Sequence, residues 1–247
     1  MIKGYIKLPS LKPMSDSKIE TRLLSDYEWK QYVFFFLLKY YKAVEQKEIL
    51  SLIETETNKT RSNIESTIKK HIRNWLTWKC AEFDLYEFKI NREASSEANA
   101  DGYYDLKFEH SQWHKKYFSF EAKNLGKTKS TTLSKSIDEY VYVKGKDSEN
   151  GGMYRYLICK YADDVNFGGM IGFAIAKTEN SIIEKLIGKI YTVYDNNSIG
   201  KLTKEKIIKN SLSGNPNTFD SIHIRQNNKI NENEEFFLHH IIMDFTN

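Results

Sequence analysis

Two alternating segments, Tyr103–Glu109 and Tyr117–Lys123, constrain the fold of this 247-residue chain more than any other feature. In both, apolar and polar residues follow one another with the period of two that is typical of a β-strand. The polar residues 110–116 between them predict an antiparallel hairpin with a long loop. Because successive side chains point to opposite faces, the aromatic residues are expected to face the core.

The opposite face of this hairpin carries three charged side chains. Alternation places Glu121 and Lys123 together, away from Phe118 and Phe120, and puts Asp105 on the corresponding face of the partner strand. Two carboxylates from adjacent strands can hold a hard divalent cation, and a nearby lysine can reach a phosphate. The pattern therefore favours metal-assisted phosphodiester cleavage. The alternative is an ordinary amphipathic hairpin whose polar face is solvated.

Glu-x-Lys is a weak signal by itself, and the chain has other copies: Glu28-Trp-Lys30, Glu45-Gln-Lys47 and Glu87-Phe-Lys89. The first two fall on predicted helices, where positions i and i+2 do not share a face. The third has only Asp84 upstream, which is too close to lie on a neighbouring strand. One rival stays open, in which Asp84 and Asp105-Leu-Lys107 take the same roles one strand earlier.

Helical periodicity precedes the hairpin. Ser25–Ala43 is apolar on most faces, a short helix is expected at about Lys47–Glu54, and Ser62-x-x-Glu65 predicts a capping box before an amphipathic helix that includes Trp75. Three such helices resemble a helix-turn-helix unit in outline. A helical layer packed on a sheet is the preferred interpretation, because three-helix patterns are common.

The remaining elements predict a mixed α/β (α+β) fold. A strand is expected at Phe83–Ile90, a helix near Leu133–Val143, a buried strand at Gly168–Ala176, a helix at Asn180–Tyr194, and closing strands at Phe219–Gln226 and Phe236–Phe245. Met153–Tyr161 fits no single element, and the polar residues up to Pro216 suggest none. Residues 1–60 are expected to form an N-terminal helical region packed on a core of residues 61–247.

Composition limits the class of protein. The formal charge of +4 permits nucleic-acid binding without requiring it. Cys80 and Cys159 make no disulfide framework. The first residues do not show the charged region and following apolar region of a secretory signal, and no apolar run is long enough for a membrane span. A cytoplasmic protein is expected. His239-His240, in an apolar segment, are expected to be structural and not zinc ligands.

The order helix, three strands, helix, strand, with the acid on the second strand and Glu-x-Lys on the third, resembles the PD-(D/E)XK nuclease superfamily. The resemblance covers roughly Ser62 to Lys177, and Tyr104 stands where many members have proline. It implies a restriction-endonuclease-like core, in which a mixed central sheet is flanked by helices. Three antiparallel strands and a fourth parallel strand would place the site where the hairpin strands diverge.

The resemblance also implies a set of ligands. Asp105, Glu121 and the Ala122 carbonyl would bind Mg²⁺ or Mn²⁺, with waters completing an octahedron. The metal would lower the pKa of a water, and Lys123 would orient that water or neutralise the developing charge. Glu65, on the preceding helix, is a further candidate ligand, although its expected capping role already explains it fully. Asp101, in a turn by its chemistry, is the other candidate acid.

Basic residues could contact the phosphate backbone. The region after the third strand and its helix commonly supplies a cation in the superfamily, and Arg155 and Lys160 are the candidates here. A phosphate-binding rim is expected from four lysines near the hairpin: Lys115, Lys116, Lys127 and Lys129.

These expectations lead to a Mg²⁺-dependent DNA endonuclease. The resemblance suggests restriction or phage defence, with a separate ATPase, helicase or recognition subunit, and a homodimer is a further expectation. No phosphate-binding Gly-x-x-x-x-Gly-Lys-Ser/Thr loop is present. The alternatives are a catalytically inactive nuclease-like subunit that binds nucleic acid, and a helix-turn-helix regulator that uses residues 62–78 for recognition.

Overall fold

The structure is a computed structural model that describes residues 25–44, 46–59, 63–82, 88–95, 103–113, 116–128, 131–144, 149–176, 181–212, 215–227 and 231–246. The helices are α1 (Asp26–Ala43), α2 (Gln46–Thr57), α3 (Ile64–Glu82), α4 (Leu133–Val141), α5 (Gly152–Leu157) and α6 (Ile182–Tyr194). The strands are β1 (Phe88–Ser95), β2 (Tyr103–His110), β3 (Phe118–Leu125), β4 (Val143–Lys144), β5 (Glu149–Asn150), β6 (Phe167–Ala174), β7 (Lys201–Lys209), β8 (Thr218–Asn227) and β9 (Glu232–Asp244).

A seven-stranded sheet in the order β1-β2-β3-β6-β9-β8-β7 forms the centre of the protein. The middle pairs, β3 with β6 and β6 with β9, are parallel, whereas the remaining pairs are antiparallel. Parallel strands are buried on both faces, and β6 accordingly has no exposed residue. The predicted mixed α/β (α+β) class, with helices flanking a central sheet, is confirmed.

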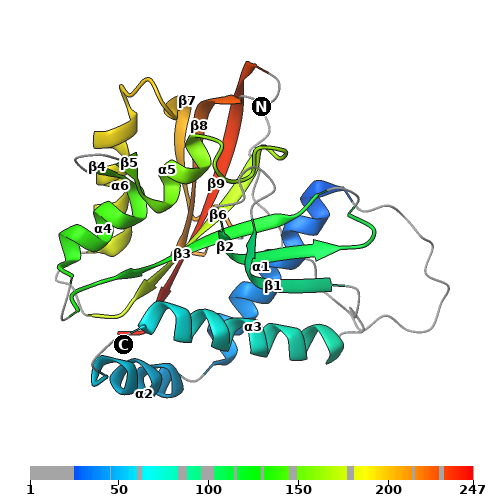
Figure 1. Ribbon diagram of the computed structural model, residues 1–247, viewed down its shortest axis with the longest axis vertical. Coiled ribbons are helices and arrows are strands. Elements are labelled where there is room, and N and C mark those ends of the chain that lie inside the picture. Colours follow the sequence, from blue (N-terminus) through cyan, green and yellow to red (C-terminus); the bar gives the residue numbers. More distant parts are fainter. Residues whose placement is uncertain are drawn as a thin grey trace.

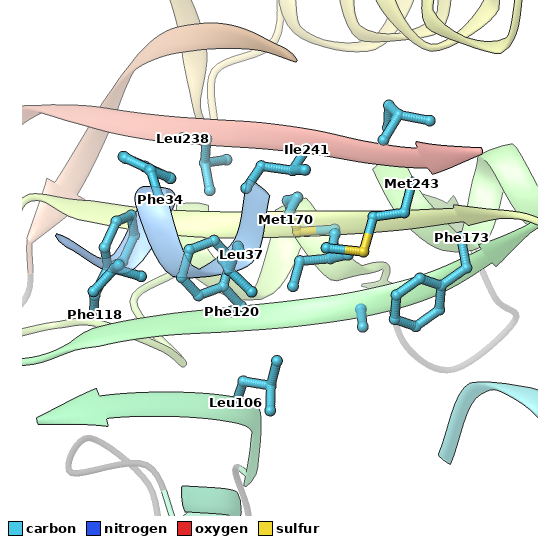
Figure 2. Close-up of a cluster of buried hydrophobic side chains, with 14 of the residues drawn as sticks. Phe34, Leu37, Leu106, Phe118, Phe120, Met170, Phe173, Leu238, Ile241 and Met243 are labelled. Atoms are coloured by element: carbon cyan, nitrogen blue, oxygen red, sulfur yellow. The ribbon is translucent and has the colours of Figure 1, made fainter. Parts of the chain in front are cut away.

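Helices cover both faces of the sheet, with α1 on one side and α4, α5 and α6 on the other (Figure 1). Beneath α1, the rings of Phe34 and Phe118 meet edge to face at 5.2 Å. Figure 2 shows Leu37 and Phe120 beside them. All four side chains are fully buried. Each contributes about 1.5–3 kcal/mol of burial energy, which fixes the strands that carry the polar residues.

The structure has a capping box at α1, where the sequence predicted none, and a different cap from the predicted one at α3. At α1, the Ser25 side chain accepts from the Glu28 backbone and Glu28 bonds back to Ser25, as a capping box requires. At α3, Ser62 lies outside the described residues, and the Asn63 side chain accepts the Ser66 N–H at 3.3 Å. The cap is therefore one residue later than predicted, and Glu65 is not the capping-box partner.

Three stretches differ from the sequence expectations. The polar residues before Pro216 contain β7, an edge strand whose many lysines hid its pattern. Residues 153–161, which fitted no element, begin with the short helix α5. The predicted loop from Ala94 begins inside β1, while residues 83–87 lie outside the described part of the chain. None of the described helices is both long and apolar enough to cross a lipid bilayer.

Candidate active site

The strands β2 and β3 diverge at the predicted acids. Their pairing ends at Leu106↔Phe120, and from Phe120 onward β3 pairs with β6 instead. Asp105 and Glu121 are the next residues on the two diverging strands. With no backbone partner from β2, the Ala122 N–H donates to Oδ2 of Asp105 at 2.7 Å. The divergence thus fixes one carboxylate oxygen of Asp105 against β3.

Glu121 is the most buried acid of this region, with 1 % of its surface exposed. One of its oxygens, Oε1, lies 2.7 Å from Lys123 Nζ and 2.9 Å from Arg155 Nη1. Burial raises the pKa of Glu121 to about 7, and the charge of Asp105 adds to this, against the opposing effect of Lys123 and Arg155. Such a carboxyl changes protonation near neutral pH, as catalytic and metal-binding carboxyls often do.

Helix α3 supplies the acidic residue Glu65 and the basic residue Lys69 from the other side of β3. Lys69 Nζ bonds to Oδ1 of Asp105 and lies 3.1 Å from Oε1 of Glu65. The same Glu65 oxygen is 4.0 Å from Lys123 Nζ. Burial lowers the pKa of Lys69 and Lys123, but the neighbouring carboxylates outweigh it and raise both, so both lysines are held as cations.

Helix α5 supplies Arg155, which three groups hold in place. Its Nε donates to Asn150 Oδ1 at 3.0 Å, and its Nη1 donates to the Tyr161 hydroxyl at 3.0 Å as well as to Glu121. Gly152 lets this helix approach β3, because a Cβ there would lie 2.5 Å from Met170 Cε and 3.3 Å from Glu121 Cγ. Figure 1 shows β3 running between α5 and α3, which bring these groups together.

The result is a cluster of six charged side chains, three of them buried and three partly exposed. We call it the carboxylate–lysine cluster: Glu65, Lys69, Asp105, Glu121, Lys123 and Arg155. Three negative groups face three positive groups, so the formal charges cancel. The polar face of the hairpin is not solvated, since Asp105 is only 9 % exposed. An ordinary amphipathic hairpin would leave these groups in water.

The cluster fits a hard divalent cation by its donor chemistry. In a strand the N–H and C=O of one residue point to the same side, so the Ala122 carbonyl is directed with its N–H toward Asp105. Carboxylate and carbonyl oxygens are the ligands that Mg²⁺ and Mn²⁺ prefer. Among the described residues, no three acidic, His or Cys side chains already converge as a metal site.

The structure brings six of the predicted site residues together: Asp105, Glu121, Ala122, Lys123, Glu65 and Arg155. Lys160 lies in the turn after α5, where its N–H bonds to the Arg155 carbonyl. In the competing assignment, Asp84 lies outside the described residues. Lys107 Nζ is 2.9 Å from Glu109 Oε1 and 4.3 Å from the centre of the Tyr117 ring.

The predicted phosphate-binding lysines are only partly described. Lys116 lies at the closed end of the hairpin, 2.6 Å from Asp26, whereas Glu121 lies at the open end. Lys127 is exposed just after β3, on the side of the cluster. Lys115, Lys129 and the alternative acid Asp101 lie outside the described residues. Of the two predicted lysines that the structure describes, only Lys127 lies on the side of the cluster.

Sequence reasoning missed Lys69, Asn150 and Tyr161 as members of the site. For Lys69 a signal existed: it is four residues from Glu65 on a predicted helix, beside the apolar stripe of Ile68 and Ile72. For Asn150 and Tyr161 no local pattern pointed to Arg155, because α5 itself fitted no element.

A cavity of about 250 Å³ adjoins the cluster at Glu65, between the start of α3, the end of β3 and α4. Its walls are largely polar and include Asn124, Ser136 and Glu139. The buried Oδ1 of Asn124 accepts from no other described residue, so a water or a hydrogen-bond donor of a ligand would satisfy it.

No protein-family model, curated protein or solved structure matches this chain. What the carboxylate–lysine cluster does must accordingly be argued from its own chemistry.

Proposed function

We propose that this protein is a metal-dependent phosphodiester hydrolase that cleaves DNA, with Asp105, Glu121 and Lys123 at its centre. The observation that carries the proposal is the burial of two carboxylates from diverging strands beside Lys123, which lies 2.7 Å from Glu121. Ion pairs offset the desolvation cost of such a cluster poorly, so it is weak evidence of a stabilising role. Buried, mutually perturbed carboxyls are instead concentrated at functional sites.

Each side chain has a role in this reaction. Asp105 and Glu121 hold the cation, together with the Ala122 carbonyl. A bound Mg²⁺ or Mn²⁺ would supply Lewis-acid chemistry, activating a water and stabilising charge on the phosphate. Lys123, kept protonated by the surrounding carboxylates, neutralises charge on the scissile phosphate. Arg155 is fixed by Asn150 and Tyr161, and offers a second cation on the α5 side.

The choice of DNA and the biological setting rest on the sequence resemblance. Restriction or phage defence, with recognition or energy supplied by a separate subunit, is part of the same proposal. A helix-turn-helix regulator is less well supported, because α3 directs Lys69 and Glu65 into the cluster. A catalytically inactive subunit is also less well supported, since Asp105, Glu121 and Lys123 are all in place.

A cleavage assay tests the proposal. Supercoiled and linear DNA are incubated with the protein and Mg²⁺, Mn²⁺ or EDTA, beside Glu121→Ala and Lys123→Ala. We expect metal-dependent nicking or linearisation that both variants lose. Glu184→Gln removes an exposed acid paired with Lys209 on the far edge of the sheet and serves as a control that retains activity.

Cleavage that persists in a folded Glu121→Ala protein would refute the assignment. Separate substitution of Asp105 and Asp101 identifies the acid that holds the metal, and full activity without Asp105 would count against this acid. If the protein cleaves RNA and not DNA, the assignment of the catalytic residues is kept and the proposed substrate changes from DNA to RNA.

A further inference from the structure

Lys69 occupies a position that a cation ligated by Asp105 and Glu65 would take. Its ammonium bonds to Oδ1 of Asp105 and lies 3.1 Å from Oε1 of Glu65. Its side chain is only 7 % exposed. Because Ile68 and Ile72 on the same helix are fully buried, α3 itself is fixed beside Asp105.

Both carboxylate oxygens of Asp105 have a hydrogen-bond donor while Lys69 is in place. One carboxylate oxygen accepts from the Ala122 backbone, and the other accepts from Lys69. The bond from the Ala122 N–H is set by the divergence of β2 and β3, so it is expected to remain when a ligand binds. A divalent cation at Asp105 would lie within about 2–2.6 Å of the second oxygen, where it would repel the ammonium strongly.

The other two cations are less suited to this exchange. Arg155 is bound to Asn150 and Tyr161 in addition to Glu121, so three contacts would have to be given up. Lys123 contacts Glu121, not Asp105. Lys69 is a compact charge on a flexible four-carbon stem, which can move aside without disturbing its helix.

We propose that Lys69 is a built-in competitor for the divalent cation, which holds Asp105 and Glu65 in place until metal displaces it. Lys69 therefore sets the metal affinity of the site. The inference rests on the proposed function for the identity of the ligand, and it adds a positioning residue that the sequence pattern did not indicate. Once displaced, the ammonium is free to meet a phosphate beside Lys123.

Mn²⁺ binding to the whole protein without DNA tests this inference, measured by titration calorimetry and by the loss of the free-Mn²⁺ electron paramagnetic resonance signal. Lys69→Met keeps the length of the side chain and removes its charge. We expect Mn²⁺ to bind about tenfold more tightly or better, since one like charge leaves the pocket. Lys70→Met changes an exposed lysine on the same helix and should leave the affinity unchanged.

Lys69→Arg gives the opposite result and does not depend on the folding of Lys69→Met. A guanidinium can hold Asp105 and Glu65 through several donors, so Mn²⁺ should bind more weakly than in the wild type. Where the wild type binds Mn²⁺ measurably, an equal affinity in Lys69→Arg would overturn the inference. So would equal or weaker binding in a folded Lys69→Met protein, judged by circular dichroism.

Glu121→Gln separates this inference from the proposed function. Mn²⁺ binding that Glu121→Gln abolishes but Lys69 variants do not alter overturns the role of Lys69 alone. Binding that appears only in Lys69→Met supports the inference in its strongest form. No Mn²⁺ binding in any of these proteins would overturn the metal site itself, and with it the proposed function.

Discussion

The central sheet buries polar side chains in two regions, and it satisfies them in different ways. At the divergence of β2 and β3, the carboxylate–lysine cluster consists of formal charges of both signs. On β8 and β9, His223, Ser221 and His240 form a chain of hydrogen bonds of 2.9 Å that ends on the Tyr140 hydroxyl. We call this second region the histidine network.

The histidine network contains neutral groups. Burial lowers the pKa of His223 to about 4 and that of His240 well below its usual value, so both rings are uncharged at neutral pH. The second nitrogen of His223 bonds to the Gly200 carbonyl at 2.7 Å, which completes its partners. Satisfied neutral networks stabilise and specify a core, whereas buried charges stabilise it poorly. Formal charge, and not burial of polarity, distinguishes the proposed site from the histidine network.

The largest expected difference between the two regions is in activity. Lys123→Met removes the cation nearest Glu121 and should lower the DNA cleavage rate about 10³-fold or more, since a positioned charge that stabilises the transition state has this value. Ser221→Ala interrupts the histidine network and should leave the cleavage rate of the folded protein within about twofold. Single-turnover cleavage at saturating Mg²⁺ measures both. A comparable loss of cleavage rate in Ser221→Ala would contradict the proposed difference in role between the cluster and the histidine network.

A large loss of stability is expected at Arg225, which ties β8 to the segment between α5 and β6. The guanidinium of Arg225 is fully buried, pairs with Glu234, and donates to the carbonyls of Tyr156, Ala162 and Val165. Arg225→Met would leave these acceptors unpaired and lower the free energy of unfolding by about 3–5 kcal/mol. It would also loosen the segment that carries Tyr161, the partner of Arg155.

Urea denaturation measures this loss, and Lys209→Met is the matched control. Lys209 also contacts an acid, Glu184 at 2.7 Å, but both are exposed. Removal of an exposed pair should change the free energy of unfolding by less than about 1 kcal/mol. Similar values for the two variants would mean that Arg225 is not the anchor that its contacts indicate.

The sequence predicted the hairpin and its acids because both depend on local alternation. Strands β2 and β3 lie within one or two residues of their predicted ends, and Asp105, Glu121 and Lys123 do converge. Lys69 was not predicted as a site residue, since its contact with Asp105 depends on how α3 packs across the sheet. β7 was missed because an edge strand with a lysine-rich pattern has no apolar face to reveal it.

The two regions should also respond oppositely to pH. The pKa of His223 is about 4 in the folded protein, below its ordinary value of 6.5, so between these values the unfolded chain binds the extra proton. The stability that His223 provides is therefore present above pH 6.5 and lost as the pH falls to 4. Relative to His223→Gln, which does not titrate, the wild type should lose about 3 kcal/mol over this range. A flat difference between the two unfolding curves would contradict the buried, neutral ring.

Glu121 should give an effect of opposite sign. Its pKa of about 7 lies above the ordinary 4.5, so the folded protein binds the extra proton between these values and stability falls as the pH rises through them. Glu121→Gln should therefore be more stable than the wild type at pH 8, by about 3 kcal/mol, and no more stable at pH 4.5. The loss of the ion pairs with Lys123 and Arg155 is part of this difference, because both cations already lower the pKa of Glu121. A variant that is less stable at pH 8 would show that the ion pairs outweigh burial. A more stable variant that binds no Mn²⁺ would show that the protein keeps this carboxylate for its chemistry and against its stability.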